Sequence, residues 1–135
     1  LCRNTFMGHS AFMRGIFAHE ILREVRRAIY IDIGDLLVLS DIAELWGLFD
    51  EFDDQQLVGI AKANGVGMGQ GDLHGSKQKW WVNTGVLLLD LDRQRRQDFT
   101  SEVLATAWEQ EGACSQADMS LMGWLLLGKQ ELFYE

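Results

Sequence analysis

Two carboxylates interrupt the apolar stretch IYIDIGDLLVLSDIAELW, residues 29–46. Asp32 and Asp35 follow a short apolar run rich in β-branched residues, which predicts a buried strand. In open α/β sheets, ligands bind beyond the carboxyl ends of the strands, where these two side chains would lie. Neighbouring carboxylates repel each other unless a cation or hydrogen-bond donors compensate. The pair is therefore consistent with a site for Mg²⁺ or Mn²⁺, which prefer oxygen ligands and phosphates.

A second interpretation of the pair is turn chemistry, because an Asp often ends a strand and Ile33-Gly34 suits a bend. Geometry separates the two interpretations. In an extended strand, residues i and i+2 share a face, whereas residue i+3 lies on the other face. Asp32 and Asp35 can therefore bind one ion only if the chain bends at Gly34, where glycine permits a bulge.

The elements around this pair predict an α/β fold. Apolar spacing near 3.6 predicts a helix over 10–25 that buries Ile21 and Leu22, and Asp41 with Glu44 predicts the capped start of a second helix. A charged amphipathic helix follows over 92–110, and another begins at Ser115. The inward side chains of the helix over 92–110 are expected to be Phe99, Val103, Leu104 and Trp108. Strands are predicted after residue 27, and over 36–39, 57–63, 80–91 and the terminal ELFYE. This alternation favours a layered fold with a mainly parallel sheet flanked by helices, in one partial domain over 1–135.

Charge and hydropathy exclude some classes of partner. The net charge of −8 argues against a nucleic-acid partner, since phosphate backbones are bound by clustered Lys and Arg. No run of about 18 apolar residues occurs, so no membrane span is expected within this chain. The arginines form two local groups, which we interpret as solvated helix faces: Arg23, Arg26 and Arg27, and Arg93, Arg95 and Arg96.

Three blocks of the sequence together resemble glycosyltransferase family 8. Tyr-Ile-Asp, then Asp35 and LLVLSDIAELW, resembles the family's DxD region, and WVNTGVLLLDLDRQR resembles its Asn-Thr/Ser-Gly block. SQADMSLM resembles its third block, where a helix opens with Ala-Asp-Gln-Asp. DIAELW and QQLVGI look most like the LARGE and glucoside xylosyltransferase branch. The blocks occur in the family's order and cover roughly residues 10–127.

The resemblance implies a GT-A-type, Rossmann-like fold, incomplete here at both ends, and a retaining transferase. Such enzymes move a sugar from a UDP-sugar, here UDP-xylose, UDP-glucose or a similar donor, to a hydroxyl of a glycan or glycoprotein acceptor. A divalent metal, usually Mn²⁺ and alternatively Mg²⁺, bridges the acidic pair and the diphosphate. LARGE-like relatives imply the Golgi lumen, through a membrane anchor outside this chain, whereas bacterial relatives imply the cytoplasm.

The resemblance also assigns roles at the diphosphate. Asp35 matches the second Asp of DxD and is the better metal ligand. Asp32 matches the first, although the spacing Asp-Ile-Gly-Asp is one residue longer, and it is a second ligand or a ribose contact. Arg14, eighteen residues before Asp32, matches a basic residue that holds the diphosphate. Without the resemblance, Arg14 would be a solvated helix residue.

The remaining candidates lie at the sugar. Asn83, Thr84 and Gly85 match the block whose Asn contacts the donor sugar, and Asp118 matches the first Asp of the third block, beside the transferred sugar. The resemblance thus makes Asp118 and Asn83 the catalytic candidates. Each has a structural alternative: Asn83 could satisfy nearby backbone, and Asp118 could form a capping box with Ser115.

The sequence departs from the family in places that bear on activity. Met119 and Ser120 stand where the family usually has Gln-Asp, so a carboxylate near the reaction centre is lost. The family's opening uridine-binding strand and its late His metal ligand have no counterpart in these 135 residues. The alternative function is therefore a catalytically weak or inactive relative that binds a nucleotide sugar, a glycan or a protein without transfer.

Overall fold

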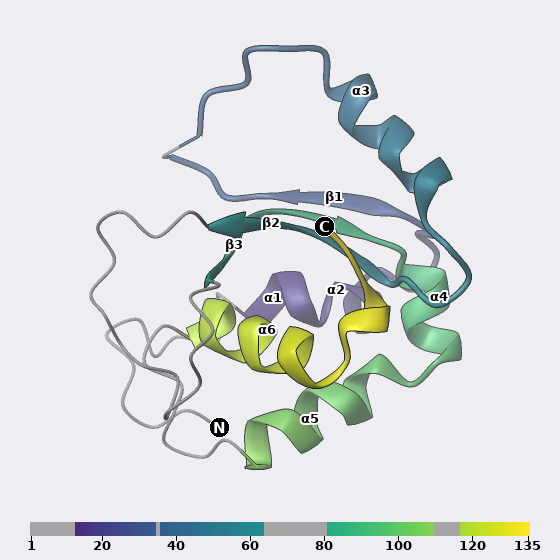
Figure 1. The fold of residues 1–135 in the computed structure, drawn as a ribbon. Coiled ribbons are helices and arrows are strands. Elements are labelled where there is room, and N and C mark those ends of the chain that lie inside the picture. The colour runs from purple at the N-terminus through teal and green to yellow at the C-terminus, as the bar shows by residue number, and fades with distance from the viewer. Residues whose placement is uncertain (1–12, 35, 64–80, 110–116) are drawn as a thin grey trace.

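Four strands form one sheet in the computed structural model, which describes residues 13–34, 36–63, 81–109 and 117–135 (Figure 1). The strand order across the sheet is β1-β3-β2-β4. The strands are β1 (Ala28–Ile31), β2 (Val58–Ala63), β3 (Trp81–Leu89) and β4 (Phe133–Tyr134). The predicted strands after residue 27, at 57–63, at 80–91 and in ELFYE are therefore confirmed.

The layered α/β architecture is confirmed, but the strand pairings are mixed. β1 and β2 each pair antiparallel with β3, while β4 pairs parallel with β2. β1, β2 and β4 therefore share one direction, but two of the three pairings are antiparallel, so the sheet is mixed rather than mainly parallel. β3 is the exception, because it follows β2 along the chain and returns beside it in the opposite direction.

Helices cover both faces of the sheet. α1 (Met13–Ile16), α2 (Ala18–Ile21), α5 (Phe99–Glu109) and α6 (Ala117–Gly128) lie on one side, and α4 (Leu91–Arg96) joins β3 to α5 (Figure 1). On the other side lie α3 (Ile42–Gly47) and the 3-10 helix η1 (Leu48–Glu51). A short 3-10 helix, η2 (Gln130–Leu132), leads into β4.

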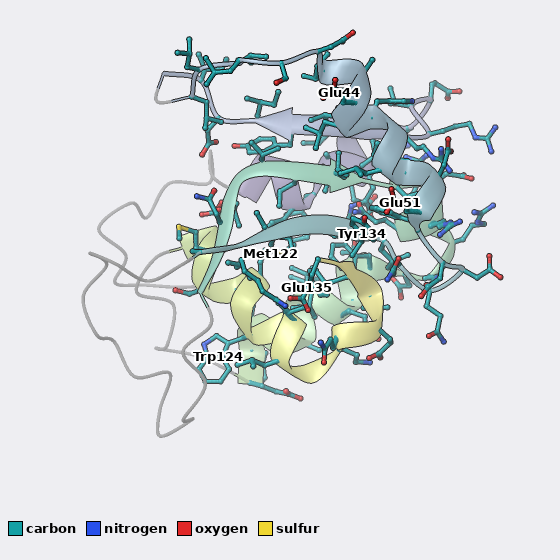
Figure 2. The ribbon with its side chains drawn as sticks, turned by 45° about the horizontal axis from the view of Figure 1, so that its top comes forward. Glu44, Glu51, Met122, Trp124, Tyr134 and Glu135 are labelled. Atoms are coloured by element: carbon teal, nitrogen blue, oxygen red, sulfur yellow. The ribbon has the colours of Figure 1, made fainter. Side chains whose placement is uncertain are left out.

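Alternation along β3 explains the two cores. Leu87 and Leu89 belong to the main core beneath the helices α1, α2, α5 and α6. Leu88, which points to the opposite face, packs with Phe49 and Phe52 in a smaller core under α3 and η1. Tyr134 of β4 completes this smaller core: its ring stacks on Phe52, with centroids 5.2 Å apart, and its hydroxyl donates to the carboxylate of Glu51 (Figure 2).

The predicted strand at 36–39 does not form. Its residues are exposed, with Leu37 80% and Leu39 84% accessible. A strand must pair its backbone groups with a neighbour, and no segment within the described part of the chain pairs with this one. The Asp41 cap that follows is confirmed, because its side chain accepts a hydrogen bond from the Ala43 amide at 2.9 Å.

Two predicted helices are broken. The helix predicted over 92–110 divides into α4 and α5 at Gln97 and Asp98, where Asp98 has a φ of 51°. Phe99 and Val103 are buried as expected, but Leu104 and Trp108 are exposed. The helix predicted over 10–25 ends at residue 21, with Ile21 and Leu22 exposed rather than buried. No helix among the described residues is long and apolar enough to cross a membrane.

Candidate functional site

Asp32 lies directly beyond the carboxyl end of β1, held by two hydrogen bonds. Its amide donates to the Gly85 carbonyl at 2.8 Å, which extends the pairing of β1 with β3 by one residue. The hydroxyl of Tyr30 donates to Oδ1 of Asp32 at 2.7 Å. Burial, followed by this hydrogen bond and the charge of Asp32, raises the pKa of Tyr30 to about 12. Tyr30 therefore remains a hydrogen-bond donor across the physiological range.

The chain bends after Asp32, which both the metal and the turn interpretations of the pair predict. Gly34 has a φ of 120°, a backbone conformation that residues other than glycine rarely adopt. This left-handed residue lies between Asp32 and Asp35, so the two aspartates do not follow one straight strand. Asp35 lies outside the described residues, and its role as a metal ligand stays a prediction.

A bulge in β3 contains the Asn-Thr-Gly block. Ile60 of β2 pairs with Leu87, whereas the next residue, Ala61, pairs with Asn83. One step along β2 therefore corresponds to four residues along β3, and 84–86 form the irregular part. Bulges re-aim side chains and are frequent beside active sites. Here the bulge lies alongside the end of β1.

The bulge directs two polar groups into the site. Thr84 is buried and hydrogen-bonds the carboxylate of Asp118. Asn83 is exposed, and its Oδ1 accepts from the Gly85 amide at 2.8 Å, so the backbone-satisfying alternative is realised for this oxygen. A Cβ on Gly85 would lie 3.0 Å from Oδ1 of Asn83 and 3.6 Å from Oδ2 of Asp32. Glycine at 85 thus leaves room for both neighbours.

Asp118 occupies the first turn of α6 and is only 9% exposed. Burial raises its pKa most, and the charge of Asp32 raises it further, while hydrogen bonds from Thr84 and nearby backbone amides act in the opposite direction. The capping-box alternative is not tested, because Ser115 lies outside the described residues. The charge of Asp32 therefore acts on Asp118, although 86 positions separate the two residues in the sequence.

The position after Met119 supplies no carboxylate. Ser120, where the family resemblance would have Asp, is 1% exposed. The acidic part of the site among the described residues is thus Asp32 and Asp118.

Helix α1 packs against the same corner. A Cβ on Gly15 would lie 3.1 Å from the Tyr30 ring, so helix and ring are in close contact. Arg14 precedes Gly15 in α1, which places its backbone beside the site. Its side chain is outside what the structure describes, and its contact with a diphosphate stays a prediction.

The described residues offer some, but not all, of the oxygen ligands that a divalent cation such as Mg²⁺ needs. No group of three His, Cys, Asp or Glu side chains within the described ranges could hold a metal by itself. Asp32 nevertheless offers a carboxylate, and Mg²⁺-like ions commonly use one or two carboxylates with substrate phosphates and water. The described residues therefore suit a metal that arrives with a phosphate-bearing ligand.

Five of the seven predicted site residues come together here: Asp32, Asn83, Thr84, Gly85 and Asp118. The sequence reasoning missed Tyr30, although its spacing of two from Asp32 already placed both on one face of the strand. It also missed the bulge, for which the Gly85 inside a strand was the available signal.

Comparisons with known proteins identify the family of the chain. The model for Glycosyl transferase family 8 matches residues 1–129. The chain is 34% identical over 110 residues to the Xylosyl- and glucuronyltransferase LARGE2 of Mus musculus, covering 78% of this chain and 14% of the relative. It is 30% identical over 135 residues to the Xylosyl- and glucuronyltransferase LARGE1 of Homo sapiens, covering 95% and 16%.

A solved structure supports the fold. The apo crystal structure of mouse Xyloside xylosyltransferase 1 superposes with a TM-score of 0.72 at 23% identity, over 93% of this chain and 50% of that one. This match shows a GT-A-type fold. The chain thus spans about a sixth of the LARGE proteins and half of the xylosyltransferase. Because the family's model covers nearly all of its residues, the chain belongs to glycosyl transferase family 8.

Proposed function

We propose that the protein transfers a sugar from a UDP-sugar to a hydroxyl of a glycan or glycoprotein acceptor, with retention at the anomeric carbon. Family membership and two relatives named as xylosyl- and glucuronyltransferases support glycosyl transfer. UDP-xylose, UDP-glucose or a similar donor is the proposed substrate. The observation that carries the proposal is the meeting of Asp32, the Asn-Thr-Gly block of β3 and Asp118 at one end of the sheet.

In this proposal the diphosphate binds at the end of β1. Asp32 and Asp35 would hold Mn²⁺ or Mg²⁺ against the phosphates, and Arg14 would contact the diphosphate from α1. The cation would supply Lewis-acid stabilisation of the departing UDP. Tyr30 fixes one oxygen of Asp32 by its hydrogen bond, which leaves Oδ2 for the ligand side.

The sugar would lie between the bulge and α6. Asp118 is a buried carboxylate, so its hydrogen bonds to sugar hydroxyls would be stronger than in water. The Thr84 hydroxyl orients this carboxylate. Oδ1 of Asn83 accepts the hydrogen bond from the Gly85 amide, which orients the side chain. The NH₂ group of Asn83 would then be available to the donor sugar.

A weak or inactive relative is the second candidate, and Ser120 favours it. This buried hydroxyl replaces the second carboxylate that the family resemblance implies. Such a protein would bind the nucleotide sugar, a glycan or a protein partner but transfer no sugar.

The Golgi lumen remains the predicted location of a LARGE-like enzyme.

Calorimetric titration of UDP into the full-length protein tests the donor site. We expect binding with Mn²⁺ and its loss with EDTA. Asp32→Asn should weaken metal-dependent binding by at least about tenfold, the equivalent of 1.4 kcal/mol, and Asp35→Asn tests the second ligand separately. Asp54→Asn is the control, because Asp54 is exposed and its one hydrogen bond in the described part uses its backbone carbonyl. UDP affinity that is the same with Mn²⁺, with EDTA and in Asp32→Asn would refute the proposed site.

Donor turnover then separates the two candidates. Release of sugar from UDP-xylose or UDP-glucose, with an acceptor product whose anomeric configuration equals that of the donor by NMR, supports the retaining transferase. Metal-dependent UDP binding without turnover of any donor supports the inactive relative.

A further inference from the structure

A second pocket, of about 540 Å³, lies at the opposite end of β1 from Asp32. Its walls are the segment that enters β1, helix α3 and helix α4. Four arginines line it: Arg26, Arg27, Arg93 and Arg96. Arg27 and Asp32 are five residues apart along the strand, or about 16 Å at 3.3 Å per residue. The pocket is therefore separate from the candidate donor site.

The pocket joins two basic groups that are remote in the sequence. We expected both groups to be solvated helix faces, but the backbone amide of Asp92 donates to the Arg26 carbonyl at 3.1 Å and places the two segments side by side. Arg26 and Arg27 precede β1, whereas Arg93 and Arg96 lie on α4. The fold thus concentrates positive charge in a protein whose net charge is −8.

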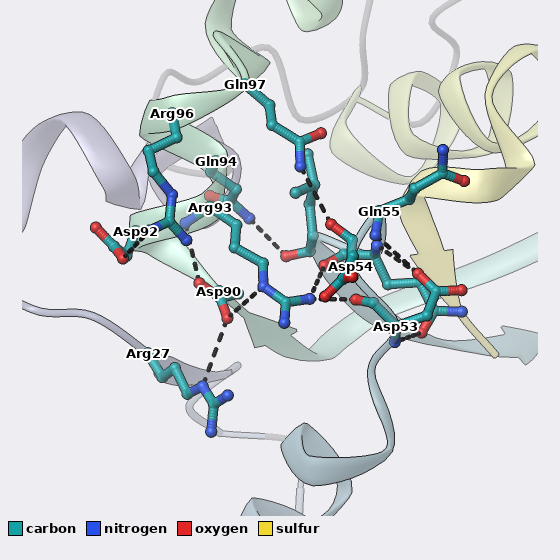
Figure 3. Close-up of polar contacts among 12 residues, drawn as sticks. Arg27, Asp53, Asp54, Gln55, Asp90, Asp92, Arg93, Gln94, Arg96 and Gln97 are labelled. Carbon is teal, nitrogen blue, oxygen red and sulfur yellow. Dashed lines mark hydrogen bonds and ion pairs between the residues drawn. The ribbon is translucent and has the colours of Figure 1, made fainter.

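Asp90 links two of the four arginines (Figure 3). This buried carboxylate accepts from the Arg93 amide at 3.0 Å, and its Oδ2 lies 3.4 Å from Nε of Arg27 and 3.5 Å from Nε of Arg93. Arg93 also donates to the Gln56 carbonyl at 3.2 Å. The side chains of Arg27 and Arg93 are therefore held in place by contacts within the protein.

The other two arginines face solvent. Arg96 pairs with Asp92 at 3.2 Å, but its side chain is 65% exposed. Arg26 is exposed, and no hydrogen bond or ion pair of its side chain occurs within the described ranges. The lining holds four arginines against two aspartates, and a third carboxylate, Asp50, lies 3.5 Å from Nη1 of Arg27, so an excess of one positive charge remains.

An aromatic side chain forms another wall. Trp46 of α3 lines the pocket, and its ring packs edge-on against Phe49 at 5.1 Å between centroids. The indole remains about half exposed, so it presents a flat, weakly polar surface beside the guanidinium groups.

We infer that this pocket is a second binding site for an anionic oxygen group, a carboxylate or a phosphate, carried on a sugar ring. Guanidinium groups match carboxylate and phosphate oxygens with paired hydrogen bonds, and the indole can cover the ring. Arg26 and Arg96 would donate hydrogen bonds to the anionic group, while Arg27 and Arg93, paired with Asp90, form the wall of the pocket. The inference concerns binding away from the donor site and does not depend on catalysis.

Three ligands that differ at one carbon test the inference: glucuronate, glucose 6-phosphate and glucose. Each is titrated into the full-length protein with EDTA present, so that metal-dependent donor binding does not contribute, and binding is followed by NMR. We expect an anionic sugar to bind and glucose not to bind, with affinity that falls as salt rises. Stronger binding of glucuronate identifies a carboxylate ligand, and stronger binding of glucose 6-phosphate identifies a phosphate ligand. Equal binding of all three sugars, or binding of none, overturns the inference.

Paired variants locate the binding. Arg26→Gln combined with Arg96→Gln should weaken binding of the anionic sugar by about tenfold or more. Arg23→Gln is the matched control, because Arg23 lies outside the pocket and contacts the Glu20 carbonyl at 3.4 Å. Equal melting temperatures of both variants and the unmodified protein show that the fold is kept. Unchanged affinity in the double variant would place the ligand elsewhere and refute the proposal.

Discussion

At the scale of single residues, Asp118 combines a functional position with an unfavourable environment. It is buried and lies near Asp32, and both facts raise its pKa above the ordinary value of 3.8. A carboxyl whose pKa is higher in the folded state favours folding when it is protonated, and this contribution is lost as pH rises through the folded pKa. At neutral pH the ionised Asp118 therefore costs stability. Stability reduced at a binding site is a common consequence of function.

Replacing Asp118 by Asn should separate stability from binding. Asn keeps the shape and the oxygen that Thr84 contacts but removes the charge, so we expect the free energy of unfolding at pH 7 to rise by about 0.5–1 kcal/mol. The gain should shrink as pH falls from 7 through the raised pKa of Asp118 to 4, because the unmodified side chain then loses its charge. Donor turnover should fall in the same variant. Urea denaturation at both pH values measures the effect, with Asp54→Asn as an exposed control that changes neither property.

A lower stability of Asp118→Asn at pH 7 would contradict this account. It would mean that the ionised carboxylate gains more from Thr84 and the backbone amides than it loses through burial and the nearby Asp32.

Most of the site was predictable at this scale, and its limits have physical causes. The acidic pair, the Gly34 bend and the Asn-Thr-Gly block are local features that a sequence displays directly. The contact between Thr84 and Asp118 depends on how far the bulge rotates β3, which no local pattern specifies. Burial of Ser120 likewise depends on the packing of α6 against the sheet.

At the scale of elements, β2 and β3 are brought together by Gly59. A Cβ at this position would lie 2.9 Å from Cβ of Leu88 and 3.1 Å from Cζ of Phe52, closer than such atoms pack. Leu88 is also its partner in the sheet register. Glycine is therefore required by the close approach of a strand and the Phe52 ring.

Gly59→Ala should reduce the free energy of unfolding by about 1–3 kcal/mol, the usual cost of overpacking a core. Gly47→Ala is the matched control. A Cβ on Gly47 would meet nothing within 4 Å, and the residue has helical φ and ψ angles at the end of α3. That substitution should be neutral or stabilise by up to roughly 1 kcal/mol. Thermal or urea unfolding of both variants measures the difference, and equal stabilities would show that β2 moves freely to admit a methyl group.

Elements were predicted well where they pair or pack within these residues. The strands β2 and β3 have strong apolar patterns and find partners in one sheet. The segment 36–39 has an equally strong pattern but no pairing partner in the described part, and propensity alone does not make a strand. The break at Asp98 was hidden because the helical pattern continues on both sides of one left-handed residue.

At the scale of the whole molecule, one face remains strongly apolar. Ile33, Leu37, Val38 and Leu39 are each more than half exposed, and the segment borders a groove of about 510 Å³ that reaches Ile31. A contiguous apolar surface of this kind is unusual on a soluble monomer. It accompanies a chain that spans half of a solved relative with the same fold.

This face should make the 135-residue chain self-associate when it is studied alone, because water favours burial of apolar surface by about 25 cal/mol per Å². Sedimentation velocity over a range of concentrations should show an average mass that rises with concentration. Leu37→Lys combined with Leu39→Lys should lower that average mass, since two solvated charges would have to be buried on association. Val25→Lys is the control: Val25 is exposed but lies outside the groove, so its replacement should leave association unchanged. A chain that stays monomeric at every concentration would show that the apolar side chains of 33–39 shield one another in water.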